Sequence, residues 1–499
     1  MSNTFLNGLK DATNFAVTEN GAITHKTTKS DLLDMFALGG AYRNRDEDDV
    51  ITLFKNALAE NETYALKCLF YLRDIRGGQG ERRFFRVCLR WLANCYPEIA
   101  IRNMQFIPEM GRWDDLFTFV GTRIEKEALE FLKTQLNLDV ASKTPSLLAK
   151  WLPSENASSL ETKRLGNIMR AYLGMSHKQY RKTLSILREK INIVERLMSE
   201  NRWEEIEFDK IPSKAGLKYR NAFARKDILK ERYKTFVMDE KTAVNAKTLY
   251  PYEVVKEAIS YNGGYYYGHR GQNDEVQRAA INKYWDNLAD YINGKVFNGI
   301  AVVDTSGSMY GTPMEVAISL GMYCAEKAEG PFKDHFITFS ANPTLQRVTG
   351  VDFCDKVSRI MQADWGMNTN VKAVFNLLLN TAVRNNCSQD EIPQNVIIIS
   401  DMEFDRCATT ASRRLNSEFE KTTLFEDIKR EWAAAGYNMP KLIFWNVNAR
   451  QNNIPMKDDG NVCYVSGFSP VLFEQILENL TAYDLMMNKL NSERYDGIH

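Results

Sequence analysis

Near residue 296 the spacing of the apolar residues changes, and this change limits the folds that the chain can adopt. From about 46 to 295, apolar residues recur at i, i+3 and i+4, the spacing of amphipathic helices, and no β-rich block interrupts them. From 296 to about 480, short β-branched runs alternate with helical patterns, as in a doubly wound parallel sheet. The predicted strands are 299–303, 335–339, 395–400, 441–446 and 462–465. The sequence therefore predicts an α + α/β fold, with an all-helical part followed by an α/β domain.

Gly and Pro residues divide the helical part into short segments. The breaks indicate helical hairpins that stack as in a HEAT-like solenoid, which can close into a ring, although no strict repeat period is present. These breaks are at Gly77-Gly78, Pro97, Pro108, Gly111 and Pro212. The predicted domains are an N-terminal arm (1–45), the helical domain (46–295), the α/β domain (296–482) and a C-terminal tail (483–499) that packs back on the helical domain.

Polar residues follow the first predicted strand of the α/β domain directly. Asp304, Ser306 and Ser308 come after 299–303, and a helical pattern begins shortly after them. In an open α/β sheet, ligands bind at loops outside the carboxyl ends of the strands. One carboxylate and two hydroxyls suit a hard divalent cation such as Mg²⁺, which prefers oxygen ligands and keeps several waters. With so few anionic ligands from the chain, such a metal still accepts a carboxylate or a phosphate from a partner.

The pattern Asp304-x-Ser306-x-Ser308 resembles the metal-ion-dependent adhesion site of von Willebrand factor A domains. Two later segments, in the family's order, resemble the parts that supply its threonine, here Thr369, and its strand-end aspartate, here Asp401. The resemblance implies that these five residues bind Mg²⁺, or another divalent cation, directly or through water.

Other interpretations of the motif stay open. Its side chains could form only the turn and N-cap hydrogen bonds that Asp and Ser favour. Ser306 could be a nucleophile with His335 and Asp401, but the Gly-x-Ser-x-Gly elbow is missing. A phosphatase-like nucleophile at Asp304 would usually have a second acid two residues later, where a serine stands. We therefore expect no enzymatic activity, with Glu403 as the best candidate for an overlooked base.

Two basic segments lie in the helical part. After the loop 77–80, Arg83, Arg86 and Arg90 form a stripe on the predicted helix, and the loop lacks the Lys-Ser/Thr of a nucleotide-hydrolysing P-loop. Between 161 and 234 there are 19 Lys and Arg against 10 Asp and Glu, a net charge of +9, so the rest of the neutral chain carries −9. Such asymmetry is typical of a nucleic-acid-binding surface. The further predicted nucleic-acid-binding residues are Lys178, Arg181, Lys182, Arg188, Lys214, Lys218 and Arg220. The same charges could equally face nearby acids or dock an acidic partner.

The remaining composition excludes some classes of protein. The net charge of zero gives no global field, and no apolar run approaches the roughly 18–20 residues of a membrane helix. The N-terminus lacks the basic and apolar regions of a signal peptide. The eight cysteines contain no Cys-x-x-Cys and are more typical of reduced core residues than of disulfides or a zinc site. We expect a cytoplasmic protein without a membrane partner.

The order of parts resembles the Ro autoantigen and its bacterial relatives, which are built on the TROVE module. The segments 72–82 and 110–116 carry this resemblance, and 150–158 and 211–219 look like an uncharacterised family of viral, bacterial and plant proteins with the same layout. The Ro resemblance implies a ring of helical repeats closed by the α/β domain, a ribonucleoprotein that binds structured RNA or single-stranded RNA ends without catalysis.

The leading hypothesis is thus a non-enzymatic RNA-binding protein with a Mg²⁺-dependent adhesion site. The alternative is a protein-interaction scaffold, in which the metal captures an acidic residue of a partner protein and the basic surface is incidental.

Overall fold

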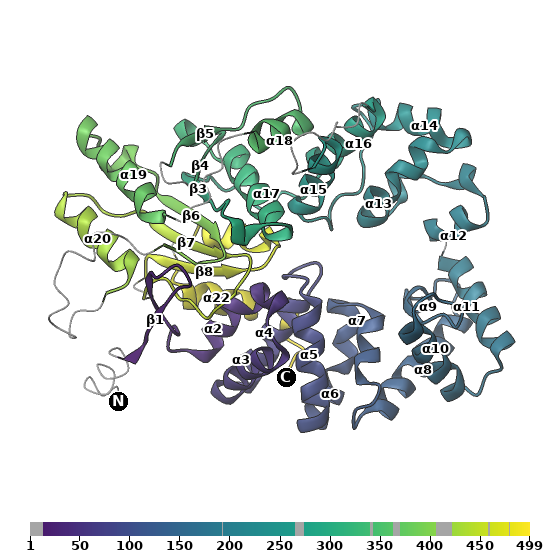
Figure 1. Cartoon of the computed structure of the whole chain (residues 1–499). Coiled ribbons are helices and arrows are strands. Elements are labelled where there is room, and N and C mark those ends of the chain that lie inside the picture. The colour runs from purple at the N-terminus through teal and green to yellow at the C-terminus, as the bar shows by residue number, and fades with distance from the viewer. Residues whose placement is uncertain are drawn as a thin grey trace. The chain divides into compact units, whose positions relative to one another are not determined.

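A computed structural model describes residues 13–191, 193–264, 274–339, 343–362, 370–405, 422–457, 460–478 and 480–499 (Figure 1). The chain forms two compact units, and each is described by itself. Unit 1 consists of Met1–Ala65 and Ala246–Ser492, and unit 2 consists of Leu66–Asn245 and Glu493–His499. This division differs from the predicted domains, because the N-terminal residues and the helices after 246 belong with the α/β part.

Unit 1 contains a six-stranded sheet with the strand order β5-β4-β3-β6-β7-β8. Neighbouring strands are parallel except β4 and β5, which are antiparallel. The strands are β3 (Gly299–Val303), β4 (His335–Thr338), β5 (Leu345–Arg347), β6 (Asn395–Ser400), β7 (Lys441–Asn446) and β8 (Val462–Ser466). All five predicted strands are present, and the α + α/β fold is confirmed. The edge strand β5 was not predicted, because it is short and its side chains are largely exposed.

The strand order reverses between β3 and β6. Chain order runs outward from β3 through β4 on one side, and from β6 through β7 and β8 on the other. Every residue of β3 is buried, as expected for a strand covered on both faces. Val303 is in register with Ile399, so the residues that follow β3 and β6 emerge side by side. This is the topological switch point at which open α/β sheets bind ligands.

Helices connect the parallel strands of unit 1 and pack on the sheet (Figure 1). Helix α17, which follows the Asp304 loop, packs so closely on β3 that a Cβ on Gly321 would lie 2.4 Å from Cγ2 of Val303. The helices of unit 1 are α2 (Asp31–Leu38), α3 (Glu47–Glu60), α15 (Pro251–Tyr261), α16 (Glu275–Asp286), α17 (Thr312–Lys327), α18 (Phe353–Met361), α19 (Val371–Asn385), α20 (Leu424–Ala434), α21 (Phe473–Ile476) and α22 (Ala482–Leu490).

The N-terminal arm contains an antiparallel hairpin that was not predicted. Its strands are β1 (Phe15–Val17) and β2 (Ile23–His25). The hairpin packs within unit 1, because the main chain of His25 exchanges two hydrogen bonds with Ile454, of 2.8 and 3.0 Å. The arm is therefore part of the α/β unit.

Unit 2 is helical throughout its described residues. Its helices are the later part of α4 (Glu62–Arg73), then α5 (Arg82–Cys95), α6 (Pro97–Asn103), α7 (Ile107–Met110), α8 (Glu125–Ala141), α9 (Leu148–Trp151), α10 (Leu160–Tyr172), α11 (His177–Ile191), α12 (Val194–Ser199), α13 (Ser213–Arg225) and α14 (Asp227–Met238). The last residues return to this unit, where Arg494 Nη2 donates to Asp74 Oδ1 (2.7 Å) and Tyr495 Oη donates to Asp74 Oδ2 (3.0 Å). The last seven residues of the predicted tail thus pack on the helical part, whereas its first residues, 483–492, belong to unit 1. Closure of the helices into a ring stays a prediction.

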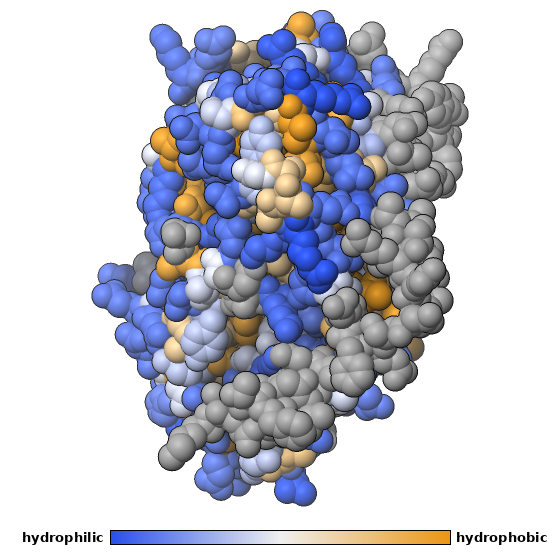
Figure 2. Space-filling view, turned by 90° about the vertical axis from the view of Figure 1, so that its left-hand side faces the viewer, coloured by the Kyte–Doolittle hydropathy of each residue, from blue (hydrophilic) through white to orange (hydrophobic). Residues whose placement is uncertain are grey.

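The surface of unit 1 is mostly polar around α19 and α20. In Figure 2, hydrophilic side chains cover most of the described part of this face, and hydrophobic ones form small separate patches. Such scattered apolar groups are normal on a globular protein. Among the described residues, no helix is both long enough and apolar enough to cross a membrane.

Candidate functional site

The first part of the candidate metal centre is the loop that leaves β3. The main chain continues the sheet for one residue, because Asp304 N donates to the Ile399 carbonyl (2.9 Å). The carboxylate of Asp304 is fully buried; Oδ1 accepts from Ser306 N (2.9 Å) and Oδ2 accepts from Ser400 Oγ (2.5 Å). The hydroxyls of Ser306 and Ser308 lie 3.0 Å apart. Both oxygens of Asp304 are therefore fixed, and two hydroxyls stand beside it.

The second part of the centre comes from the loop that leaves β6. Asp401 is buried, and its Oδ1 accepts from Glu403 N (3.2 Å). Its Oδ2 is also buried, yet it has no hydrogen-bond partner among the described residues. Met402, the next residue, has a φ of 65°, a left-handed conformation that is uncommon for a bulky side chain and that concentrates at functional sites. The turn thus holds in the interior a carboxylate oxygen that no described residue satisfies.

Electrostatics set these two carboxylates apart from ordinary surface acids. Burial, and then the charge of Asp401, raise the pKa of Asp304 to about 7, and burial also raises the pKa of Asp401. The nearby Ser308 hydroxyl opposes the shift at Asp401. Two buried carboxylates that repel each other are stabilised by a bound cation. The residues present therefore fit a hard divalent ion.

The donor set of the centre is small. Asp304, Ser306, Ser308 and Asp401 lie together, whereas the fifth predicted ligand, Thr369, lies outside the described residues. In the part of the chain that the structure describes, no three His, Cys, Asp or Glu side chains come together as a metal-binding group. A cation at this centre would thus depend on hydroxyl oxygens and waters besides the two carboxylates.

The N-terminal arm supports the loop behind Asp401. Glu19 N donates to Glu403 Oε2 (2.7 Å), Asn20 Nδ2 donates to the Glu403 carbonyl (2.6 Å), and Thr18 Oγ1 donates to the Phe404 carbonyl (2.7 Å). The other oxygen of Glu403 accepts from Asn453 Nδ2 (2.8 Å). The contacts of the arm join segments almost 400 residues apart in sequence. No sequence pattern indicated them.

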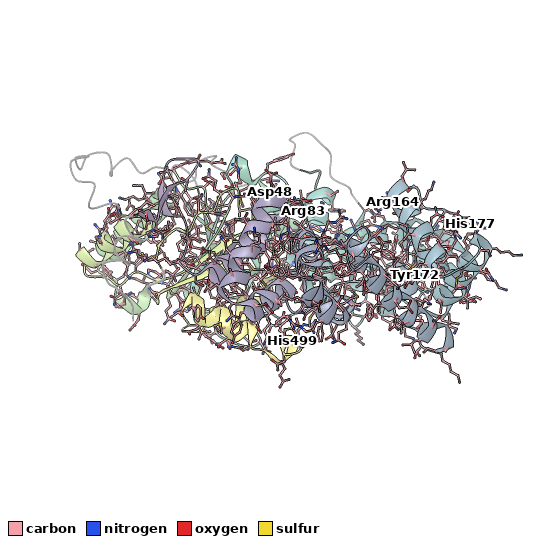
Figure 3. The ribbon with its side chains drawn as sticks, turned by 90° about the horizontal axis from the view of Figure 1, so that it is seen from below. Asp48, Arg83, Arg164, Tyr172, His177 and His499 are labelled. Carbon is pink, nitrogen blue, oxygen red and sulfur yellow. The ribbon has the colours of Figure 1, made fainter. Side chains whose placement is uncertain are left out.

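Unit 2 is the basic part of the chain. It contains 35 Lys and Arg against 25 Asp and Glu, a net charge of +10, so unit 1 carries −10. Lys178, Arg181 and Lys182 lie at i, i+3 and i+4 on α11; all three are exposed, and none has a hydrogen bond or ion pair to a described residue. We call these three residues the α11 cations. Arg164, Tyr172 and His177, on α10 and at the start of α11, lie toward the right-hand end of Figure 3.

Three of the predicted nucleic-acid-binding residues have hydrogen-bond partners inside unit 2, and their role in nucleic-acid binding stays a prediction. Arg188 donates to the carbonyls of Ala149 (2.8 Å) and Leu152 (3.0 Å), so it caps the end of α9. Arg220 is buried and donates to the Leu217 carbonyl (2.8 Å). The sequence pattern could not show this, because a basic residue in a helix carries no mark of what its guanidinium contacts.

Arg86, in the middle of the predicted basic stripe on α5, is the third residue with partners inside unit 2. Its Nε donates to Asp115 Oδ1 (2.6 Å) and its Nη2 to Asp114 Oδ2 (2.9 Å). Arg90 is exposed, and Arg83 is half-buried. On α13, Lys214 and Lys218 are exposed, with the ammonium of Lys218 5.0 Å from the ring centre of Tyr219.

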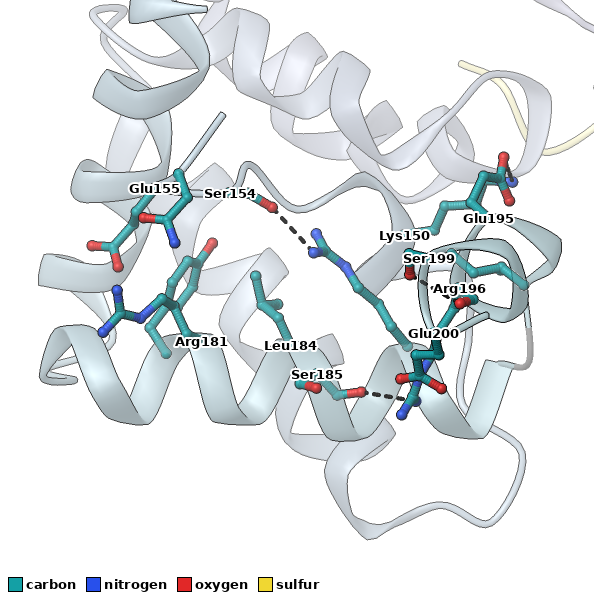
Figure 4. A pocket seen from close by; sticks show the side chains of 14 residues that line it. Lys150, Ser154, Glu155, Arg181, Leu184, Ser185, Glu195, Arg196, Ser199 and Glu200 are labelled. Atoms are coloured by element: carbon teal, nitrogen blue, oxygen red, sulfur yellow. Dashed lines mark hydrogen bonds and ion pairs between the residues drawn. The ribbon is translucent and has the colours of Figure 1, made fainter. Parts of the chain in front are cut away.

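A cavity of about 670 Å³ lies beside the α11 cations (Figure 4). Arg181, Tyr180 and Leu184 of α11 line one side, and Lys150 and Arg196 contribute from α9 and α12. Arg188 also lines the cavity, and its Nη1 donates to Ser154 Oγ (3.1 Å). Charges of both signs line the cavity, since Glu195 and Glu200 also face it.

Comparison with known proteins gives relatives of unestablished function. A domain of unknown function, DUF2828, matches residues 18–145 and 146–295, and another, DUF7788, matches 298–496. The uncharacterized protein L728 of Acanthamoeba polyphaga mimivirus is 31% identical over 511 residues, covering 93% of this chain and 85% of that protein. This confirms the predicted likeness to uncharacterised viral proteins.

One solved structure is similar over most of the chain. The crystal structure of the Ro (RSR) protein of Deinococcus radiodurans is similar over 93% of this chain and 99% of that chain, with a TM-score of 0.41 and 14% sequence identity. The family itself follows from the sequence matches, since the DUF2828 match alone spans more than half of the residues. The chain belongs to the DUF2828 family.

Proposed function

We propose that the chain is a non-enzymatic RNA-binding protein, resembling Ro ribonucleoproteins, in which unit 2 holds RNA. The observation that carries this proposal is the net charge of +10 on unit 2 together with the α11 cations, which protrude without partners among the described residues. Lysine and arginine side chains that face solvent bind phosphates and release counterions from the nucleic acid. Contacts to phosphate give affinity without sequence preference.

We further propose that unit 1 is a von Willebrand factor A domain with a Mg²⁺-dependent adhesion site at Asp304, Ser306, Ser308, Thr369 and Asp401. The buried Oδ2 of Asp401, which has no hydrogen-bond partner among the described residues, supports a bound cation. When bound, the metal offers a Lewis-acidic site to an anionic group of a partner, because two carboxylates leave much of its charge and several of its positions to other ligands. The chain's own residues fix the two carboxylates and exclude solvent from them.

The geometry around Glu403 supports a binding role rather than catalysis. Both of its side-chain oxygens accept hydrogen bonds, from Glu19 N and from Asn453 Nδ2. Burial raises the pKa of Glu403 to about 7, and the hydrogen bond from Glu19 opposes this shift. A base would need a free oxygen within reach of the proton that it removes. Glu403 instead ties the arm to the metal loop.

A second candidate function is a protein-interaction scaffold. In that case the metal centre would take a carboxylate from a partner protein, and the basic surface of unit 2 would be incidental. The pair of buried carboxylates favours this candidate as much as the first, because an under-neutralised metal accepts carboxylate and phosphate oxygens alike.

The two functions differ in what the purified protein binds. We expect a fluorescently labelled single-stranded RNA to bind the full chain, and we expect reversal of the α11 cations (K178E, R181E and K182E together) to weaken binding of all sequences alike, measured by fluorescence anisotropy.

A matched control reverses three exposed cations that already pair with an acid three residues away. These are Arg164 with Glu161, Lys210 with Glu207 and Lys230 with Asp227. The control changes the net charge of unit 2 by the same amount. Equal losses in both triple variants, or no RNA binding by the unchanged chain, would favour the scaffold.

A further inference from the structure

Unit 2 contains a cluster of arginines where the start of α5 meets the short helix at Trp113–Phe119. Asp115 is fully buried and accepts from Arg73 Nε (2.8 Å) and Arg86 Nε (2.6 Å). Asp114 accepts from Arg86 Nη2 (2.9 Å) and from Arg112, whose Nε and Nη2 approach it at 2.8 and 2.6 Å. Two carboxylates thus hold three guanidinium groups in fixed positions.

The charges of this cluster do not balance. Arg82, the first residue of α5, is exposed and has no hydrogen bond or ion pair to a described residue. Arg82 and Arg86 lie at i and i+4 on α5, so they are neighbours on one face of the helix. Burial and the charges of Arg86 and Arg112 lower the pKa of Arg82, whereas the charges of Asp114 and Asp115 raise it. Arg73, Arg82, Arg86 and Arg112 against Asp114 and Asp115 leave a net charge of +2. Beside them, Nη1 of Arg83 is buried without a partner in the described part of the chain.

Several donors of the cluster remain unused. Arg86 and Arg112 each engage the aspartates through Nε and Nη2, and the Nη1 groups of both make no hydrogen bond to a described residue. The guanidinium of Arg112 also lies over Trp151, with Cζ 4.0 Å from the ring centre. Fixed, unused N–H groups on neighbouring arginines are ready to donate to one oxyanion, and little side-chain freedom would be lost on binding.

The helix terminus itself is not available to an anion. The side chain of Glu81 caps α5 by accepting from Arg83 N (3.0 Å) and Phe84 N (3.4 Å). An incoming anion would therefore be held by side-chain guanidiniums. Planar guanidinium forks match the oxygen pairs of a phosphate, and a tetrahedral phosphate presents enough oxygens for several forks at once.

We propose that Arg82, Arg86 and Arg112 form a phosphate-binding site, with Arg82 as the arm that closes on the anion and the other two as its fixed base. The site is separate from the α11 cations and from the metal centre, so it goes beyond the proposed function. An RNA backbone phosphate, a terminal phosphate of an oligonucleotide and free inorganic phosphate share the chemistry that this site recognises.

Inorganic phosphate is the first probe, used with the full chain in EDTA so that metal-bound phosphate plays no part. We expect phosphate to raise the melting temperature above that in sodium chloride of equal ionic strength. In Arg82→Gln the dissociation constant for phosphate, measured by calorimetry, should rise about ten- to a hundredfold, since charge-assisted hydrogen bonds are lost. Because Arg82 has no hydrogen bond or ion pair to a described residue, this variant should fold normally.

Arg90→Gln is the matched control, since Arg90 is an exposed arginine later on the same helix, and it should bind phosphate like the unchanged protein. The triple α11 variant should also keep the phosphate response, so failure of the RNA proposal and failure of this one are distinguishable. A pentauridylate with and without a 5′-phosphate separates the sources: a gain from the 5′-phosphate assigns the site to oligonucleotide ends, and no gain assigns it to free phosphate. Equal stabilisation by phosphate and chloride, or unchanged phosphate affinity in Arg82→Gln, would overturn the proposal.

Discussion

Replacement of Asp401 by Asn should have two opposite effects on stability. Without metal, the variant should be more stable than the unchanged chain at neutral pH, because one of two buried, mutually repelling carboxylates is gone. With Mg²⁺, it should lose the stabilisation that the unchanged chain gains. Asp401 suits this test better than Asp304, because Asp304 accepts hydrogen bonds with both oxygens and Asp401 only with Oδ1 among the described residues.

The expected magnitude follows from mass action. Mg²⁺ at a hundred times its dissociation constant stabilises the folded state by about 2.7 kcal/mol. For a unit of this size, that corresponds to a rise in melting temperature of roughly 5 °C. Differential scanning calorimetry measures the melting temperature with and without Mg²⁺, for the unchanged chain, Asp401→Asn and Asp390→Asn. Asp390 is an exposed acid of the same unit and serves as the matched control.

The reasoning would be refuted by a Mg²⁺ response of the same size in Asp401→Asn and in the unchanged chain. Without metal, an Asp401→Asn protein that melts below the unchanged chain would contradict the predicted repulsion between the carboxylates of Asp304 and Asp401 in the folded state.

Four further predictions concern single residues. Burial would raise the pKa of Glu426, but the hydrogen bond from His25 outweighs it and lowers this pKa to about 2. The ionised Glu426 therefore stabilises the fold above its ordinary pKa of 4.5, and this stability is lost as the pH falls toward 2. In Glu426→Gln, the free energy of unfolding in urea should fall less between pH 5 and pH 3 than in the unchanged chain. With Mg²⁺ present, neither the unchanged chain nor Glu403→Gln should cleave RNA or nucleotides. Metal-dependent cleavage by the unchanged chain that is lost in Glu403→Gln would identify an enzyme. Arg188→Gln should lower the melting temperature of the chain without changing the salt dependence of RNA binding, since its guanidinium caps α9. Gly321→Val should destabilise the chain by more than 1 kcal/mol in urea unfolding, because its side chain would overlap Val303; an unchanged midpoint would show that α17 can move away from β3.

The sequence predicted the sheet well for a physical reason. The central strands are buried on both faces, so β3 and β6 appear in sequence as unbroken β-branched runs. Asp304, Ser306 and Ser308 were predicted from their place after the first strand, and Asp401 from the resemblance to von Willebrand factor A domains. The four residues lie together because the carboxyl ends of neighbouring parallel strands meet at one edge of the sheet.

The hydrogen bonds between distant segments of the chain could not be predicted from the sequence. The hairpin β1–β2 is short, and its partners at Glu403, Phe404 and Ile454 are distant in the chain. The role of Ser400 as a donor to Asp304 was likewise hidden, since a serine that ends a strand commonly faces solvent. Such contacts depend on which loops the fold brings together.

Counting charges identified the basic unit but could not show what each basic side chain contacts. The excess of basic residues in 161–234 correctly placed the positive part of the chain in unit 2. It could not separate Lys178, which faces solvent, from Arg188, which caps a helix, because both lie in the same helix with the same charge. Only the positions of the carbonyls of α9 distinguish them.

The salt dependence of RNA affinity tests the central claim most directly. Each phosphate of single-stranded RNA that a cation neutralises contributes about −0.7 to the slope of log K against log salt, so the α11 cations together should contribute roughly −2. The unchanged chain should therefore give a slope of about −2 to −4, since the wider basic surface adds phosphate contacts. The triple α11 variant should give a slope that is flatter by about 2 on the same relation. An affinity independent of salt, or one with the same slope in both proteins, would contradict RNA binding through this surface.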